Sequence, residues 1–287
     1  CDVDPVALAE CGRHYGVTRL FADAAGLLAE PLDAALILTS GDHAPVALAA
    51  LERGLHVLVE KPLAYSVSET DDVIAAAERA GKTLMVGMMK QYDPGYQRGA
   101  ELVQAMRDLR YVSATTLEAD GTAYMSHHPI ARSGDSRQSG PRAYGAEMFT
   151  AIQQAILSRQ PRELLREATG SDDPAVQAAY TLLISSSIHD INVLRGALGQ
   201  PEAVLSANLW AGGTSFTATL AYAGDVRANY TWTLIPYLKN YSQTFAFHGS
   251  DEFVRIIFPS PYLRNAPTHV DLARMKGGEL EETRLTV

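Results

Sequence analysis

The first 87 residues alternate between short apolar runs and helical patterns, and this alternation restricts the fold more than any other feature. The apolar runs read as strands and lie at residues 32–39, 56–59 and 83–87. The helical patterns lie at residues 6–15, 45–53 and 68–80. Strands separated by helices predict a parallel sheet of the α/β class. The run at residues 32–39 is almost wholly apolar, which is typical of a strand covered on both faces.

The strand at residues 56–59 is followed at once by Glu60, Lys61 and Pro62. A charged residue at the carboxyl end of a parallel strand lies where open α/β sheets bind their ligands. The proline ends the ladder and fixes the backbone after the lysine. An isolated lysine in a loop is usually solvated, so the functional interpretation of Lys61 depends on its context.

The composition is ordinary for a globular protein, and the length suggests two domains. The chain has 287 residues, of which 47% are hydrophobic and 20% charged. Its formal net charge of −9 provides no basic field for nucleic acid or an anionic membrane. Cys1 and Cys11 are too few for a disulfide scaffold, so a reducing cytoplasm is expected. No signal peptide or membrane-spanning apolar run is visible.

After Gln91 the pattern changes to helices followed by many strands. Helices are expected at residues 94–109, 143–166 and 173–198. Strands are expected at residues 111–118, 203–210, 215–222, 226–234, 241–249 and 252–258. Successive strands joined by turns favour a mostly antiparallel, open sheet in an α+β domain. We therefore expect a nucleotide-binding Rossmann domain at residues 1–91 and a second domain at residues 92–287.

Three stretches occur in an order that points to a known family. They are TSGDH with AALERGLHVLVEKPL (residues 39–43 and 49–63), VGMMKQYDP (86–94) and HDINVLR (189–195). Together they resemble the Gfo/Idh/MocA oxidoreductases, which include glucose-fructose oxidoreductase and inositol dehydrogenase. The signature of that family is a Glu-Lys-Pro triplet, matched here by residues 60–62.

The resemblance implies an NAD-type cofactor held at the carboxyl edge of the first sheet. It implies cofactor contacts from the loop that carries Thr39, Ser40 and His43, and from Glu60 and Lys61. His43 could instead cap the helix that follows it.

The resemblance also favours Asp2 as the acidic residue that binds a ribose. Because a carboxylate there repels a 2′-phosphate, NAD is expected rather than NADP. Asp2 and Asp4 could alternatively cap the helix at residues 6–15, and Asp4 before Pro5 suits an N-cap. No G-x-G-x-x-G sequence occurs in the chain. We therefore expect that a preceding strand, loop and helix of about 30 residues belongs to the native protein.

On the substrate side, the resemblance implies contacts from Lys90 and Tyr92. Considered alone, Lys90 would be a surface residue and Tyr92 a core residue. His127 and His128 lie in a long polar stretch at residues 120–142. Adjacent residues of a strand point to opposite faces, and no cysteine or third histidine lies at a suitable spacing, so we predict a loop or lid and no metal site.

A second cluster surrounds His189. Residues three and four apart share a helix face, so Ser185, His189 and Asn192 are expected together, with Asp190 about 100° away. Relatives carry an Asp at the position of Ser185 and often another at that of Asn192. The neutral side chains here can hydrogen-bond an imidazole or a sugar hydroxyl, but cannot stabilise an imidazolium by charge. His189 is therefore expected either in catalysis and substrate binding or as a buried structural residue.

The function that this resemblance implies is NAD-dependent hydride transfer to or from a secondary alcohol of a polyol, sugar or sugar derivative. Lys61 and His189 would be its acid/base pair. Three alternatives stay open: a redox-cycling lyase or glycosidase, a cofactor-binding regulator without turnover, and a chain that binds no dinucleotide.

A homodimer or homotetramer through the C-terminal sheet is expected. The resemblance implies that the pairing face is the one that carries the large apolar side chains of TWT (231–233) and FAF (245–247). Relatives usually end with one more helix, so the charged tail after Asp271 is expected to be incomplete.

Overall fold

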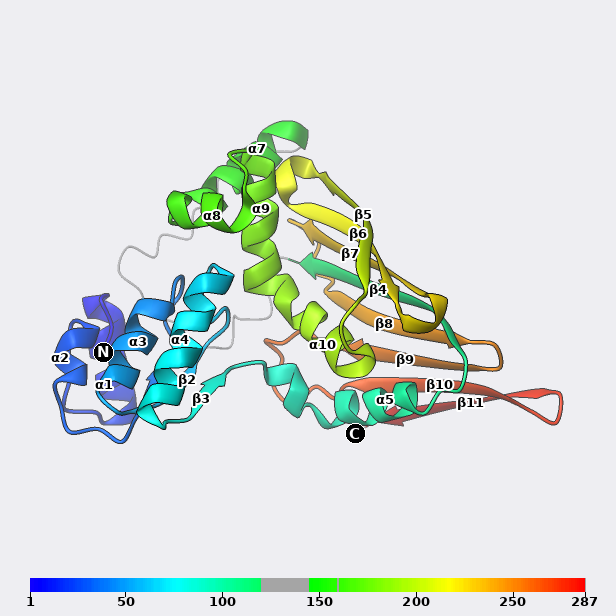
Figure 1. Ribbon diagram of the computed structural model, residues 1–287, viewed down its shortest axis with the longest axis horizontal. Coiled ribbons are helices and arrows are strands. Elements are labelled where there is room, and N and C mark those ends of the chain that lie inside the picture. The colour runs from blue at the N-terminus through cyan, green and yellow to red at the C-terminus, as the bar shows by residue number, and fades with distance from the viewer. Residues whose placement is uncertain (120–144, 159, 287) are drawn as a thin grey trace. The chain divides into compact units, whose positions relative to one another are not determined.

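The computed structural model describes residues 1–119, 145–158 and 160–286. The described chain forms two compact units: the first is Cys1–Gly87, and the second begins at Met88 (Figure 1). Each unit has its own sheet and its own hydrophobic core.

The first unit is built on a parallel sheet. Its strands are β1 (Ala34–Ile37), β2 (His56–Val59) and β3 (Leu84–Val86), in the order β1-β2-β3. Its helices are α1 (Pro5–Tyr15), α2 (Ala24–Leu28), α3 (Ala44–Glu52) and α4 (Val67–Ala80). The α/β class expected for this half is confirmed.

Local capping explains where two of these helices begin. The Asp4 carboxylate accepts hydrogen bonds from the backbone N–H groups of Val6 (2.8 Å) and Ala7 (3.2 Å), which confirms its expected N-cap role. Helix α4 starts with a capping box made by Ser66 and Glu69. The helix thus begins at Val67, one residue before the start of the expected helical pattern at residues 68–80.

The core of the first unit lies on one face of the sheet. Val57 and Val59 are buried against α3 and α4, together with Leu51 and Val73. Alternate residues of a strand point to opposite faces. Leu36 of β1 points to the other face of the sheet, where it is 65% exposed. The expectation that the strand at residues 32–39 is covered on both faces is therefore wrong for the described residues.

The second unit is organised around an eight-stranded sheet in the order β11-β10-β9-β8-β4-β7-β6-β5. Its strands are β4 (Leu109–Ala119), β5 (Ala203–Trp210), β6 (Ser215–Tyr222), β7 (Val226–Ile235), β8 (Ser242–Gly249), β9 (Glu252–Phe258), β10 (His269–Lys276) and β11 (Glu279–Thr286). Neighbours pair antiparallel, except that β4 and β7 run parallel. The predicted mostly antiparallel sheet is confirmed.

The helices of this unit include a break that the sequence does not reveal. They are a 3₁₀ turn (Met89–Tyr92), α5 (Pro94–Gln104), α7 (Gly145–Leu157), α8 (Arg162–Thr169), α9 (Pro174–Leu182), a π-helical turn (Leu183–Ser187) and α10 (Ile188–Leu198). The helix expected at residues 173–198 thus contains a π turn. The helix expected at residues 143–166 is divided, because Pro161 precedes α8.

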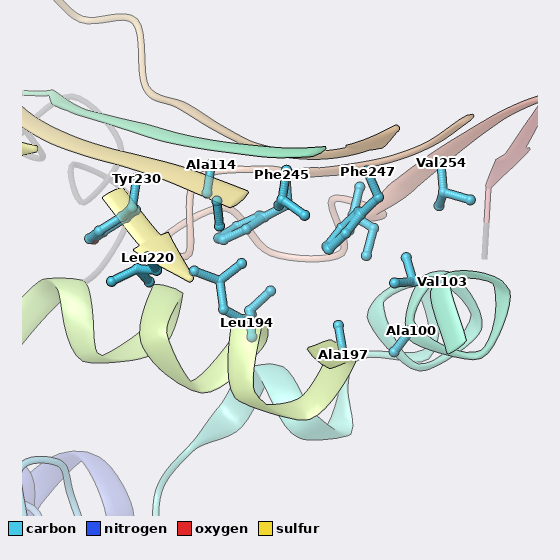
Figure 2. Packing of buried hydrophobic residues seen from close by; sticks show 14 of the residues in the cluster. Ala100, Val103, Ala114, Leu194, Ala197, Leu220, Tyr230, Phe245, Phe247 and Val254 are labelled. Atoms are coloured by element: carbon cyan, nitrogen blue, oxygen red, sulfur yellow. The ribbon is translucent and has the colours of Figure 1, made fainter. Parts of the chain in front are cut away.

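The large apolar side chains of the sheet lie inside this unit. Phe245 and Phe247 point from β8 toward Leu194 and Ala197 of α10, with α5 beside them (Figure 2). Trp232 is 1% exposed. The aromatic face therefore packs under helices of the same chain, and its assignment to subunit pairing is wrong.

The charged tail forms a strand pair, β10–β11. Gly277 and Gly278 connect the strands with φ values of 61° and 87°, which glycine adopts without strain.

Candidate active site

The rim of the first sheet holds Lys61. The last backbone bond between β1 and β2 runs from the N–H of Glu60 to the carbonyl of Ile37, at 2.8 Å. The Glu60 carboxylate then accepts a hydrogen bond from the N–H of Lys61 at 3.2 Å. Pro62, after a cis peptide bond, begins a buried stretch. Lys61 is half-buried. It lies just after the end of β2, as the sequence predicted.

A second loop leaves β1 at the same edge. Thr39 and Ser40 are exposed, and Gly41 has a φ of 98° with open space where a Cβ would lie. His43 differs, because it is only 1% exposed. It occupies the N-cap position of α3 without making a side-chain cap bond.

Asp2 lies on the surface before α1. One carboxylate oxygen accepts a hydrogen bond from the N–H of Asp4 at 2.8 Å, and its own N–H donates to the carbonyl of Phe21 at 3.2 Å. Of the two aspartates, Asp4 alone supplies the helix cap. The carboxylate of Asp2 therefore remains at the protein surface.

The Ser185 hydroxyl and the Asn192 amide each bond to a group other than His189. Ser185 lies in the π turn, where the four-residue spacing of an α-helix does not apply. Its hydroxyl donates to the carbonyl of Thr181 at 2.6 Å. The amide oxygen of Asn192 accepts from Gln91 Nε2 at 2.5 Å. His189 is half-buried at the start of α10.

The burial of Lys90 and Tyr92 is the opposite of what each residue type alone would suggest, namely a lysine on the surface and a tyrosine in the core. Lys90 is 5% exposed, whereas Tyr92 is 62% exposed. Lys90 Nζ donates to the amide oxygen of Gln243 and lies 4.3 Å from the ring centroid of Phe258. Burial lowers the pKa of Lys90 to about 8, against the opposing attraction of nearby carboxylates, of which Asp190 is the strongest.

Asp190 is the centre of this buried network. Its Oδ1 accepts from Gln243 Nε2, and its Oδ2 accepts from Thr116 Oγ1 at 2.7 Å and from the Tyr230 hydroxyl at 2.8 Å. Burial raises the pKa of Asp190, while Lys90 and these three hydrogen bonds lower it. The network fixes the start of α10 to the sheet, next to His189.

Sequence reasoning missed most of this network. Gln243 alternates with Phe245 and Phe247, so it lies on the core-facing side of β8. A polar residue at a core position needs a buried partner. A polar residue in an apolar, alternating pattern was therefore the sequence signal for Gln243. The same signal marks Thr116, which alternates with the buried Ala114 on β4.

The described residues contain no group of three His, Cys, Asp or Glu side chains placed to hold a metal ion. His127 and His128 lie outside the described residues. Among the described helices, none combines the length and apolar character needed to cross a bilayer.

Comparison with known proteins connects the first unit to a family. Residues 1–88 match the Gfo/Idh/MocA model, described as an oxidoreductase family with an NAD-binding Rossmann fold. D-xylose 1-dehydrogenase (NADP(+)) 2 of Haloferax volcanii is 46% identical over 92 residues, which are 31% of this chain and 28% of that protein. Inositol 2-dehydrogenase 3 of Saccharopolyspora erythraea is 36% identical over 106 residues, which are 36% of this chain and 31% of that protein. The match thus spans less than a third of either relative.

Solved structures extend the likeness to both units. Myo-inositol 2-dehydrogenase from Lactobacillus plantarum has a TM-score of 0.64 at 19% identity, covering 89% of this chain and 67% of that one. The WlbA dehydrogenase from Bordetella pertussis, solved with NADH and UDP-GlcNAcA, has a TM-score of 0.64 at 17% identity, covering 90% and 70%. At these identities the likeness is one of fold.

Proposed function

We propose that this chain is a member of the Gfo/Idh/MocA oxidoreductases and an NAD-dependent dehydrogenase. Its substrate would be a secondary alcohol of a polyol, sugar or sugar derivative. The family match supports this proposal, as do relatives named for xylose, apiose and inositol. The observation that carries it is the position of Lys61 at the carboxyl end of a parallel strand, because α/β sheets bind ligands at that edge.

The residues at this edge fit a nucleotide. Two loops leave neighbouring parallel strands there, and the exposed Thr39 and Ser40 offer hydroxyl and backbone groups beside the open space at Gly41. We propose that these residues, with Glu60 and Lys61, hold the cofactor. NAD is proposed over NADP because Asp2 keeps a carboxylate at the surface, where it would repel a 2′-phosphate.

The bound nicotinamide would supply a hydride acceptor at its C4 carbon. In the oxidation direction the substrate C–H bond breaks and its electron pair leaves with the hydride, while the hydroxyl proton must pass to a base. We assign that base to His189, with Lys61 orienting the hydroxyl or relaying its proton. An unperturbed lysine has a pKa of about 10.4 and is a poor base at neutral pH, which favours this division of roles.

The substrate would be held by residues of the second unit. Tyr92 is the most exposed of the four expected contacts, and we propose it as a direct one. Lys90, Ser185 and Asn192 each have a hydrogen-bond partner within that unit. We propose that these three act by shaping the site.

Replacing Lys61 tests the proposal. Lys61→Met should lower kcat by about a hundredfold or more, because general acid–base groups contribute at least that factor. The Kd for NAD, measured by calorimetry, should change less than about threefold, since only one of several contacts is lost. NADH absorbance is followed with myo-inositol and D-xylose. Lys82→Met, at the opposite end of the sheet, is the control, and an unchanged kcat in Lys61→Met rejects the role.

A second candidate is a cofactor-binding regulator without turnover. It is favoured by the neutral side chains of Ser185 and Asn192, whose hydrogen bonds are made within the protein. A regulator would bind NAD and yield no NADH with any polyol or sugar. A redox-cycling lyase or glycosidase would form product without net NADH.

We further propose a homodimer or homotetramer that pairs through the C-terminal sheet. The face opposite the aromatic core carries short hydroxyl side chains that are half-buried, namely Ser113, Thr115, Thr217, Thr231 and Thr244. We keep the cytoplasm as the proposed compartment, because Cys1 and Cys11 are both free thiols on the surface.

A further inference from the structure

The imidazole of His43 connects the two loops at the rim of the first sheet. Its Nδ1 lies 2.6 Å from the carbonyl oxygen of Pro62, and its Nε2 lies 2.7 Å from that of Thr39. The two carbonyls belong to different loops, one following β1 and the other following β2. A single buried side chain therefore contacts the backbone of both.

These contacts give His43 a role other than helix capping or direct contact with a ligand. The first N–H of α3 is served by Asp42, whose carboxylate accepts from Ala44 at 3.1 Å. Both ring nitrogens of His43 are within hydrogen-bond distance of carbonyl oxygens, and the side chain is 1% exposed. A molecule bound at the rim would meet the loops that the ring holds.

The link lies just beyond the end of the strand ladder. The last backbone bond between β1 and β2 joins Glu60 to Ile37. Two residues beyond each end of this bond, the segments that follow β1 and β2 meet again, because the His43 ring contacts the carbonyls of Thr39 and Pro62. Because the ring is fixed at the start of α3, it sets the separation of the two loops before any ligand arrives.

We propose that His43 is a positioning residue that presets the Thr39–Gly41 loop and Lys61 for the cofactor. The role in cofactor affinity rests on the proposed function. Groups that are already placed for a ligand bind it more tightly, because less ordering accompanies binding. Loss of the link should therefore loosen both loops and weaken NAD binding together.

The test compares His43→Phe with Leu51→Ala in the native full-length protein. Phenylalanine keeps a buried ring but cannot donate a hydrogen bond. Leu51 is 1% exposed near the other end of α3, so its truncation weakens the same core while both contacts of the His43 ring stay in place. Amide exchange of residues 38–42 and 60–65 is measured relative to Val73 and Ala77 in the core of α4, which corrects for overall destabilisation.

In His43→Phe this ratio should rise about tenfold or more, and the Kd for NAD should weaken by about the same factor, since the buried hydrogen bond that the ring donates to the loop backbone is lost. His43→Gln, which keeps one amide donor, should lie between. Leu51→Ala should leave the exchange ratio within about twofold, because the α4 reference corrects for overall destabilisation. It should also leave the Kd for NAD within about twofold, because the contacts of His43 with both loops are kept. An unchanged ratio in His43→Phe, or an equal rise in Leu51→Ala, overturns the loop link.

Amide exchange and NAD affinity distinguish failure of the loop link from failure of the proposed function. If the native protein binds no NAD, the proposed function fails and the role in cofactor affinity fails with it, while amide exchange still decides the loop link. If the loops loosen in His43→Phe and NAD affinity stays unchanged, the role in cofactor positioning is overturned.

Discussion

At the scale of single residues, the most unusual feature is the buried pair of ionisable groups under the sheet. Lys90 and Asp190 do not touch directly, because Gln243 lies between them and bonds to both. Removing a charge from water is costly, and only fully satisfied hydrogen bonding compensates for it. Two further donors, Thr116 and Tyr230, also bond to the Asp190 carboxylate and help to satisfy it.

Because the pKa of Lys90 is lowered, we predict that the free energy of unfolding changes in mildly alkaline solution. Its pKa is about 8 in the folded chain, against about 10.4 for an unfolded lysine. Between these values the unfolded chain binds more protons, so the free energy of unfolding rises with pH. The penalty for the buried charge is fully present below pH 8 and is relieved as pH increases through that window.

Urea unfolding of the native protein and Lys90→Met at several pH values from 7 to 10 checks this effect. The native curve should gain stability relative to the variant as pH rises. Lys82→Met, which alters a less buried lysine, provides the control. Parallel curves for native protein and Lys90→Met would show that Lys90 titrates normally.

At the scale of elements, close packing of α5 on the sheet depends on Gly99. A Cβ at this position would lie 2.6 Å from Cγ1 and Cδ1 of Ile256, which is fully buried on β9. Overpacking of this kind usually costs about 1–3 kcal/mol. Helix propensity acts in the other direction, since alanine is better than glycine by about 1 kcal/mol.

We predict that Gly99→Ala lowers the free energy of unfolding, because the clash exceeds the gain in propensity. Adding Ile256→Val should recover part of the loss by removing Cδ1. Arg98→Ala, on the exposed side of α5, should be nearly neutral. A Gly99→Ala protein more stable than the native one in urea would contradict the packing argument.

The predictability of individual elements follows from their burial pattern. Strands β5, β6 and β9 agree with the expected bounds, because turns or loops mark their ends and hydrophobic residues recur along them. Strand β11 was missed because nearly all of its residues are exposed and it has no apolar face. The Gly277–Gly278 pair was the available signal for that hairpin.

The location of Lys61 after a strand could be predicted from the sequence, whereas the contacts of the other candidate residues could not. Lys61 could be placed because a strand, a charge and a proline follow one another. The π turn at Leu183–Ser187 could not be predicted, because neither proline nor glycine marks it in the sequence. Likewise, the two-sided contacts of His43 join loops that are distant in sequence.

At the scale of the whole molecule, the sheet of the second unit offers a broad face for assembly. Thr115 of β4 and Thr231 of β7 are paired neighbours near its centre, on the side away from the aromatic core. Short hydroxyl side chains such as these can pack against a second copy of the chain with little loss of side-chain entropy. Charged side chains introduced there would repel across a two-fold interface.

Light scattering tests this assignment. The native protein should have the mass of a dimer or tetramer, and Thr115→Arg combined with Thr231→Arg should shift it toward the monomer. Gln97→Arg, on the exposed surface of α5, should leave the mass unchanged. A native monomer, or an assembly unaffected by the two arginines, would remove this face from consideration.

We propose that Lys61 and His189 serve a single hydride transfer. It is tested most directly by mass spectrometry of NADH formed by the native protein from NAD and polyols or sugars deuterated at the reacting carbon, with myo-inositol, D-xylose and D-glucose as probes. We predict that deuterium appears in the NADH, and that Lys61→Met and His189→Asn bind NAD but form almost none. Bound NAD with no labelled NADH from any probe, or undiminished transfer in either variant, would contradict the account.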